Sequence, residues 1–188
     1  VDAHVYESPR RIIVARQAEE VAEVLAAADA ARLAEGGTLA GYIAYEAGLA
    51  LEPKLADLAQ VRCGAGGPLV WLGLFGAAGT LPSEAVPDWL SARSEGTASI
   101  GPLDPQLSPG GYAEAFAALQ DAIRAGDIYQ ANLTFQLAGS YRGDPLALYA
   151  ALRPAAQAGY GGIVFDGTHW LLSLSPELFF SLRCRSQC

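Results

Sequence analysis

Two short runs of the sequence carry neutral polar side chains at alternate positions, a spacing that could line a binding site. The first is GDIYQANLTF, residues 126–135, in which Gln130, Asn132 and Thr134 alternate with apolar residues. Alternate side chains of an extended strand point to opposite faces of its sheet. Amides and hydroxyls that face a cavity need hydrogen-bonding partners, which a polar ligand can supply. The row therefore predicts a cavity wall for a small polar ligand, although it also suits a solvated sheet face.

The second run, SLSPE, places Ser173, Ser175 and Glu177 on one face if its strand persists. Pro176 has no amide proton for a neighbouring strand, so it marks a strand edge or a bulge and turns Glu177 out of the regular sheet. We expect the two rows to line one cavity together, with the carboxyl of Glu177 at its rim.

Helix and turn signals define the elements that must hold these runs. Ser108 before Pro109 is typical of a helix start and Gly126 of a helix end, which predicts a helix between them. The strand of GDIYQANLTF follows directly. Its second face would join the core through Tyr129, Ala131, Leu133, Phe135 and Leu137.

The remaining elements are predicted in the same way. Asp144-Pro145 repeats the start signal for a shorter helix over 146–152, and Asp166-Gly167 is a hairpin turn signal. Helical spacing extends over 19–35. Strands are expected at 38–51, 68–77, 160–165 and 169–174. This mixture of helices and hairpins favours an α+β fold over a doubly wound parallel sheet.

Composition excludes several classes of function. The chain has 188 residues, a formal net charge of −8 and one lysine, Lys54, which argues against a nucleic-acid partner. It has no apolar run that could cross a bilayer, so we expect a cytoplasmic protein without a membrane partner. Cys63, Cys184 and Cys188 lack metal-ligand spacing, so no metal site is expected. His4 and His169 are isolated, and we expect them at the surface or at strand edges.

Several motifs resemble, in the same order, those of the chorismate-utilising enzymes, specifically the aminodeoxychorismate synthase component I family. The matching runs cover nearly the whole chain; they are residues 5–8 (VYES), 41–48 (GYIAYEAG), 123–134 (IRAGDIYQANLT), 148–153, 158–162 (AGYGG) and 173–179. The resemblance implies a partial anthranilate-synthase-like fold of mainly antiparallel sheets with packed helices. We expect a first α+β segment (1–77), a connecting loop (78–107), the start of the chorismate-binding region (108–182) and an irregular tail (183–188). The loop is indicated by its content of Pro, Ser, Gly and acidic residues.

The resemblance also implies a reaction. The family replaces the C4 hydroxyl of chorismate with an amino group, using ammonia from a separate glutaminase subunit, for 4-aminobenzoate and folate synthesis. Magnesium assists the family reaction, and its ligands are expected outside this chain. Glu177 matches the family glutamate that acts as a general acid and base at the C4 hydroxyl, a role that suits a partly buried carboxyl. Glu7, Ser8 and Tyr160 match segments that form a tryptophan pocket in relatives, although ordinary packing explains them equally well.

The sequence also departs from the family pattern. Many members continue past Ser-Pro-Glu into a Pro-Ile-Lys-Gly-Thr motif whose lysine attacks the ring. The one lysine of this chain, Lys54, does not lie in such a motif. The chain starts at Val1, contains no methionine and ends before the catalytic C-terminal half of the family fold, so we expect a truncated polypeptide that is inactive alone.

Two other functions stay open. Anthranilate synthase component I, of tryptophan biosynthesis, is the nearest enzyme alternative, but the run from Tyr129 to Leu133 favours the folate branch. A non-catalytic module that binds tryptophan or docks a glutaminase is the alternative from another class.

Overall fold

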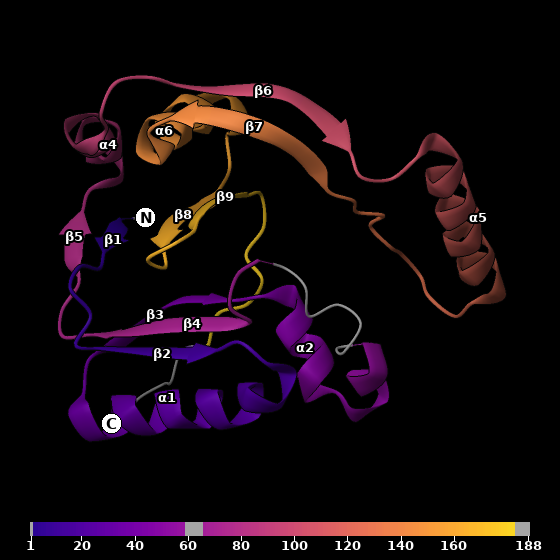
Figure 1. The fold of residues 1–188 in the computed structure, drawn as a ribbon, viewed down its shortest axis with the longest axis horizontal. Helices are drawn as coiled ribbons and strands as arrows, with labels where there is room; N and C mark the ends of the chain where they lie inside the picture. The colour runs from indigo at the N-terminus through magenta and orange to yellow at the C-terminus, as the bar shows by residue number, and fades with distance from the viewer. Residues whose placement is uncertain (1, 59–65, 183–188) are drawn as a thin grey trace. The chain divides into compact units, whose positions relative to one another are not determined.

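The computed structural model describes residues 2–58 and 66–182, in an α+β fold whose strand pairs are all antiparallel (Figure 1). The predicted fold class is therefore confirmed. The chain forms two compact units: Val1–Arg93 together with Tyr149–Cys188, and Ser94–Leu148. The three cysteines and the tail 183–188 lie outside the described residues. None of the described helices is long and apolar enough to cross a membrane.

A three-stranded sheet forms the centre of the first unit. Its order is β2 (Arg11–Ala15), β4 (Val70–Phe75) and β3 (Thr38–Ile43), and α1 (Val21–Glu35) lies along it (Figure 1). Small side chains on α1 let the helix approach the sheet closely, and they pack against apolar residues of β2 and β4. The buried residues of the two resulting clusters are Ile13, Ala15, Val21, Ala28, Ala31, Ala47, Leu69, Val70 and Leu74.

Shorter elements complete the first segment of this unit. They are β1 (Ala3–Val5), which pairs with β5 (Gly79–Leu81), the helices α2 (Tyr45–Leu51) and α4 (Val86–Arg93), and the 3-10 turns η1 (Ala18–Glu20), η2 (Pro53–Leu55) and η3 (Ser83–Ala85).

The C-terminal part of the first unit contains a hairpin of β8 (Tyr160–Phe165) and β9 (Trp170–Ser175). The strands pair from Phe165↔Trp170 at the turn to Tyr160↔Ser175 at the open end. This hairpin confirms the turn predicted at Asp166-Gly167. The helix before it, α6 (Pro145–Ala156), extends four residues beyond the predicted end at residue 152.

The second unit consists of α5 (Pro109–Ala125) and a ribbon of β6 (Ala98–Pro105) with β7 (Leu137–Gly143). Both helix signals are confirmed. The Ser108 hydroxyl accepts a hydrogen bond from the Gly111 amide at 3.0 Å, and Gly126 ends the helix in the left-handed region at φ +83°. The two ends of this unit are tied together, because the Glu95 amide donates to Asp144 at 2.7 Å.

Three predicted elements are wrong. Residues 127–136 form no strand, 44–51 turn into α2, and the predicted loop at 78–107 contains β5, α4 and β6. A strand persists only where a partner offers its backbone groups. β3 ends at Ile43, which pairs with the first residue of β4, and β7 begins at Leu137, which pairs with the last residue of β6.

Candidate functional site

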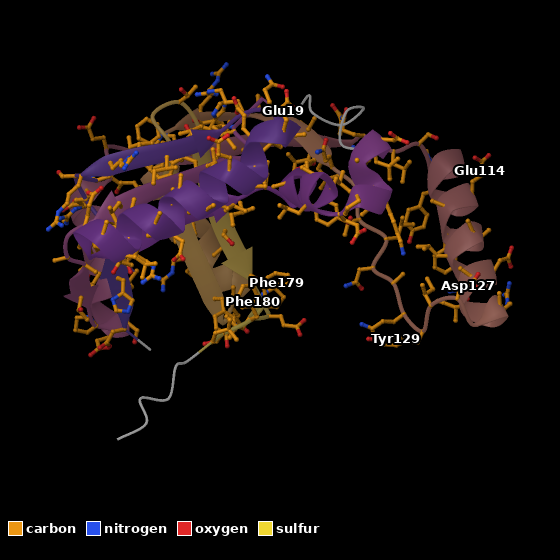
Figure 2. The ribbon with its side chains drawn as sticks, turned by 90° about the horizontal axis from the view of Figure 1, so that it is seen from below. Glu19, Glu114, Asp127, Tyr129, Phe179 and Phe180 are labelled. Carbon is orange, nitrogen blue, oxygen red and sulfur yellow. The ribbon has the colours of Figure 1, made fainter. Side chains whose placement is uncertain are left out.

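The first polar row does not line a sheet. Gln130, Asn132 and Thr134 all lie in the irregular segment 127–136, and all three residues are exposed. Tyr129, expected in the core, is 89% exposed, and its side chain stands out at the end of the loop (Figure 2). The predicted division of this segment into a core face and a polar face is therefore wrong.

Asn132 nevertheless lies beside a hollow of the second unit. The hollow has a volume of about 210 Å³, below the usual range for small-molecule sites. Its lining comes from one face of α5 and from the loop that returns along it, and consists of Tyr112, Phe116, Leu119, Gln120, Ile123, Ala131, Asn132 and Leu133. Rings build one side of this region: Tyr112 stacks on Phe116 and meets Phe135 edge-on, with centroids 6.2 Å and 6.0 Å apart. Among the members of the polar row, Asn132 alone belongs to this lining.

The second row lies at the open end of the β8–β9 hairpin. β9 ends at Ser175, directly before Pro176, so the predicted edge at this proline is confirmed. Ser175 Oγ donates to the carbonyl oxygen of Glu177 at 2.9 Å. The Glu177 residue is exposed, so the partial burial expected for its carboxyl is not observed. Ser173 is exposed as well, but its carbonyl oxygen accepts a hydrogen bond from the Tyr149 hydroxyl at 3.2 Å.

The two rows belong to different units of the chain. The expectation that the two polar rows line one cavity stays a prediction. The proposed tryptophan pocket also stays a prediction: Glu7, Ser8 and Tyr160 are exposed, and within residues 2–58 and 66–182 no hydrogen bond or ion pair joins them.

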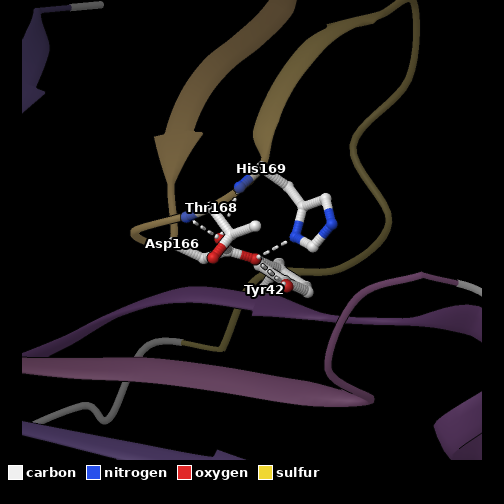
Figure 3. A network of polar contacts seen from close by, with 4 residues as sticks. All are labelled: Tyr42, Asp166, Thr168 and His169. Atoms are coloured by element: carbon white, nitrogen blue, oxygen red, sulfur yellow. Dashed lines mark hydrogen bonds and ion pairs between the residues drawn. The ribbon is translucent and has the colours of Figure 1, made fainter.

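Sequence reasoning missed a polar network around Asp166 (Figure 3). Asp166 Oδ1 accepts hydrogen bonds from the backbone amides of Thr168 at 2.8 Å and His169 at 2.7 Å. Asp166 Oδ2 accepts from the Tyr42 hydroxyl at 2.8 Å and lies 3.2 Å from His169 Nδ1. The Asp166 side chain is only 2% exposed. The residues next to Asp166 in the sequence do not indicate that its hydrogen-bonding partner lies on β3.

Burial and hydrogen bonding act in opposite directions on this carboxyl. Burial alone would raise the pKa of Asp166, but the donated hydrogen bonds from His169, Thr168 and Tyr42 outweigh burial and lower its pKa to about 2. Burial also raises the pKa of Tyr42 to about 12, with a further contribution from its bond to the Asp166 carboxylate. The network therefore contains a carboxylate and a neutral phenol at neutral pH.

Candidate metal ligands do not gather in the described ranges, where no group of three or more His, Cys, Asp or Glu residues could hold a metal ion.

Three arginine side chains form ion pairs with acidic residues. Arg11 pairs with Glu35, and Arg32 and Arg124 pair with aspartates three positions earlier on their own helices.

Comparison with known proteins identifies one family over nearly the whole chain and individual relatives over half of the chain or less. The family described as chorismate binding enzyme matches residues 3–187. Aminodeoxychorismate synthase component 1 of Klebsiella aerogenes is 32% identical over 99 residues, which are 50% of this chain and 22% of the relative. The protein of the same name from Salmonella typhimurium is 37% identical over 73 residues, or 38% of this chain and 16% of the relative.

A second enzyme name occurs among the relatives. Anthranilate synthase component 1 of Thermus thermophilus is 42% identical over 66 residues, which are 35% of this chain and 14% of the relative. The matched segments thus span less than a quarter of the length of these relatives. No solved structure matches the chain significantly.

Proposed function

The chain belongs to the chorismate binding enzyme family, and from this we propose that it forms part of an aminodeoxychorismate synthase component 1. The observation that carries this proposal is the family match over residues 3–187, together with relatives of that name from Klebsiella aerogenes and Salmonella typhimurium. The substrate would be chorismate, and the product 4-amino-4-deoxychorismate, a precursor for 4-aminobenzoate and folate.

The chemistry exchanges one group at C4 of the ring. The C4–O bond breaks, the hydroxyl leaves as water after it gains a proton, and a C4–N bond forms with ammonia. Glu177 would give the proton to the departing hydroxyl and recover one from the added ammonia, so it ends in its starting state. Its position one residue past the proline that ends β9, with an exposed side chain, leaves this carboxyl open to a substrate.

We further propose that these 188 residues bind chorismate only weakly and do not convert it alone. Chorismate carries two carboxylates, which need compensating cations. Within the described residues, Lys54 is the one lysine, and three arginines are already in ion pairs. Magnesium would assist the complete enzyme. Because the described residues do not form a metal-ligand group, we assign no step of the reaction to a metal.

A glutaminase subunit is the proposed source of ammonia, and the cytoplasm the proposed location. The test is to titrate chorismate into the purified chain by calorimetry, and then to incubate both with ammonium and magnesium salts. We expect binding without product. Turnover by the chain alone would contradict the proposed inactivity, and absence of binding would contradict the proposed function.

Anthranilate synthase component 1 is the second candidate, supported by the 42% identity to the Thermus thermophilus relative. Both enzymes use chorismate, so binding does not distinguish them. Addition of candidate glutaminase subunits, followed by identification of the product as 4-amino-4-deoxychorismate or as anthranilate, separates the two.

A non-catalytic module is the candidate from another class, and it rests on Glu7, Ser8 and Tyr160. Calorimetry with tryptophan separates it from the enzyme proposals: heat with tryptophan and none with chorismate supports the module. Heat with chorismate supports an enzyme.

A further inference from the structure

The turn of the β8–β9 hairpin is attached to the central sheet of the first unit by a side-chain hydrogen bond. The donor is the hydroxyl of Tyr42 on β3, and the acceptor is Asp166 Oδ2, 124 positions later in the chain. Figure 3 shows Tyr42 reaching from β3 to the turn where the Asp166 carboxylate lies. The other donors to this carboxylate, Thr168 and His169, belong to the turn itself. The Tyr42 hydroxyl is therefore the member of the network that joins two distant elements.

Other contacts orient both Tyr42 and Asp166 independently of the hydrogen bond between them. The Tyr42 ring stacks on Trp71 of β4, with centroids 6.5 Å apart and an angle of 11° between the planes, which fixes the direction of the hydroxyl. Two backbone amides fix the carboxylate. A carboxylate with an exposed fraction of 2% needs its donors, because burial without them disfavours the charge. The bond is thus directional and hard to replace with water.

An attachment of this kind matters because an isolated two-stranded hairpin is only marginally stable. β8 and β9 form such a two-stranded sheet. Their unbroken pairing from Phe165↔Trp170 to Tyr160↔Ser175 makes the hairpin one ribbon. A constraint at the turn therefore limits how far the whole ribbon can tilt. The limit extends to the open end of the hairpin, where the Ser175 hydroxyl donates a hydrogen bond to the carbonyl oxygen of Glu177.

We propose that Tyr42 and Asp166 are positioning residues, whose hydrogen bond orients the hairpin so that Ser175 and Glu177 are held in one place. The attachment itself follows from contacts within the first unit. Its consequence for catalysis rests on the proposed function of Glu177.

Tyr42→Phe tests the attachment, because it removes the hydroxyl and keeps the ring that stacks on Trp71. Tyr141→Phe is the matched control, since Tyr141 is exposed and its hydroxyl has no hydrogen bond within the described residues. Backbone amide hydrogen exchange is followed in the full chain. We expect amides of β9 to exchange about tenfold faster in Tyr42→Phe, as suits the loss of a hydrogen bond to a charged group, and amides of α1 to stay unchanged.

Two outcomes would overturn the proposal: unchanged exchange in β9, or equal acceleration in β9 and α1, which indicates general loss of stability. Asp166→Asn provides a second variant if Tyr42→Phe does not fold. It removes the charge of the acceptor and should accelerate the same amides. Tyr42→Phe should have a smaller effect in the Asp166→Asn background than in the unmodified chain, because that background already weakens the bond to Tyr42.

Chorismate affinity measures positioning separately from stability. It is titrated into the unmodified chain, Tyr42→Phe and Tyr141→Phe at a temperature where circular dichroism shows all three fully folded. We expect about tenfold weaker binding by Tyr42→Phe alone, whereas a residue that only stabilises the fold would leave the affinity of the folded chain unchanged. If the unmodified chain does not bind chorismate, the proposed function fails, and exchange in β9 still decides whether the hydrogen bond holds the hairpin.

Discussion

The hydroxyl of Tyr149 lies in the space that a side chain on Gly161 would fill. Tyr149 belongs to α6 and is buried, and its hydroxyl passes Gly161 of β8 to reach the carbonyl oxygen of Ser173 on β9. A Cβ on Gly161 would collide with this hydroxyl and would also lie 3.3 Å from the Ser173 carbonyl oxygen. The hairpin is therefore contacted by Tyr149 near its open end and by Tyr42 at its turn.

Gly161→Ala is expected to lower the free energy of unfolding by about 1–3 kcal/mol, the usual cost of overpacking a tight site. Gly162→Ala is the matched control, because a Cβ there meets no atom within 4 Å. It should change stability by less than about 0.5 kcal/mol. Urea unfolding monitored by tryptophan fluorescence measures both variants, and equal stability of the two would contradict the steric explanation.

Tyr149→Phe should cost about 1 kcal/mol, the typical net contribution of one hydrogen bond. It should also reduce the cost of Gly161→Ala, since the atom that the new methyl group meets is then gone. The comparison needs the two single variants and the double variant, with free energies of unfolding measured for each. Strict additivity would show that Tyr149 and Gly161 do not act on each other.

The carboxyl of Asp166 should make stability depend on acid. Its pKa is about 2 in the folded chain, below the ordinary 3.8, so the unfolded chain binds more protons in this range. The contribution of Asp166 to stability is then complete above the ordinary value and is lost as the pH falls through about 2. Tyr42 and His169 are the side chains that face this carboxyl.

Unfolding in urea at a series of pH values measures this dependence. Asp166→Asn should be less stable at neutral pH, and the difference between the two proteins should shrink as the pH approaches 2. A constant difference across this range would contradict the assignment of the low pKa to Asp166.

Two glycines at the ends of α5 should respond to substitution by alanine with opposite changes in stability. Gly126 has φ +83°, where alanine is strained, so Gly126→Ala should destabilise the helix by about 1 kcal/mol. Gly110 lies in the first turn, where a Cβ meets nothing within 4 Å, so Gly110→Ala should stabilise it by up to about 1 kcal/mol. Thermal melting of helical circular dichroism distinguishes them, and effects of the same sign would contradict this account.

Local signals in the sequence predicted local structure well. Ser108, Gly126 and the Asp166-Gly167 turn each act within a few residues, and the helix ends and the hairpin lie where they indicate. The strand predicted over 127–136 does not form. Alternating polar and apolar residues show only that a strand, if it formed, would be amphipathic. Whether it forms depends on a partner strand, and β6 supplies one only from Leu137 onward.

The candidate site was harder to predict, because some of its contacts join residues that are far apart in the sequence. Pro176 predicted the end of β9, since proline acts locally. The partner of Asp166 lies 124 positions away, and no spacing rule connects an aspartate in a turn with a tyrosine on another sheet. The comparison with relatives supplied the family, whereas the network around Asp166 came only from the arrangement of elements in space.

The hydrogen bond between Glu95 and Asp144 has a consequence for how this polypeptide can be re-engineered. It brings residues 95 and 144 together, so the segment 96–143 begins and ends at adjacent positions. The entropy of closing a loop changes only slowly with its length. A short glycine-rich bridge between residues 95 and 144 should therefore yield a minimal scaffold that keeps the central sheet and all of α6, and residues 96–143 could be exchanged as a cassette.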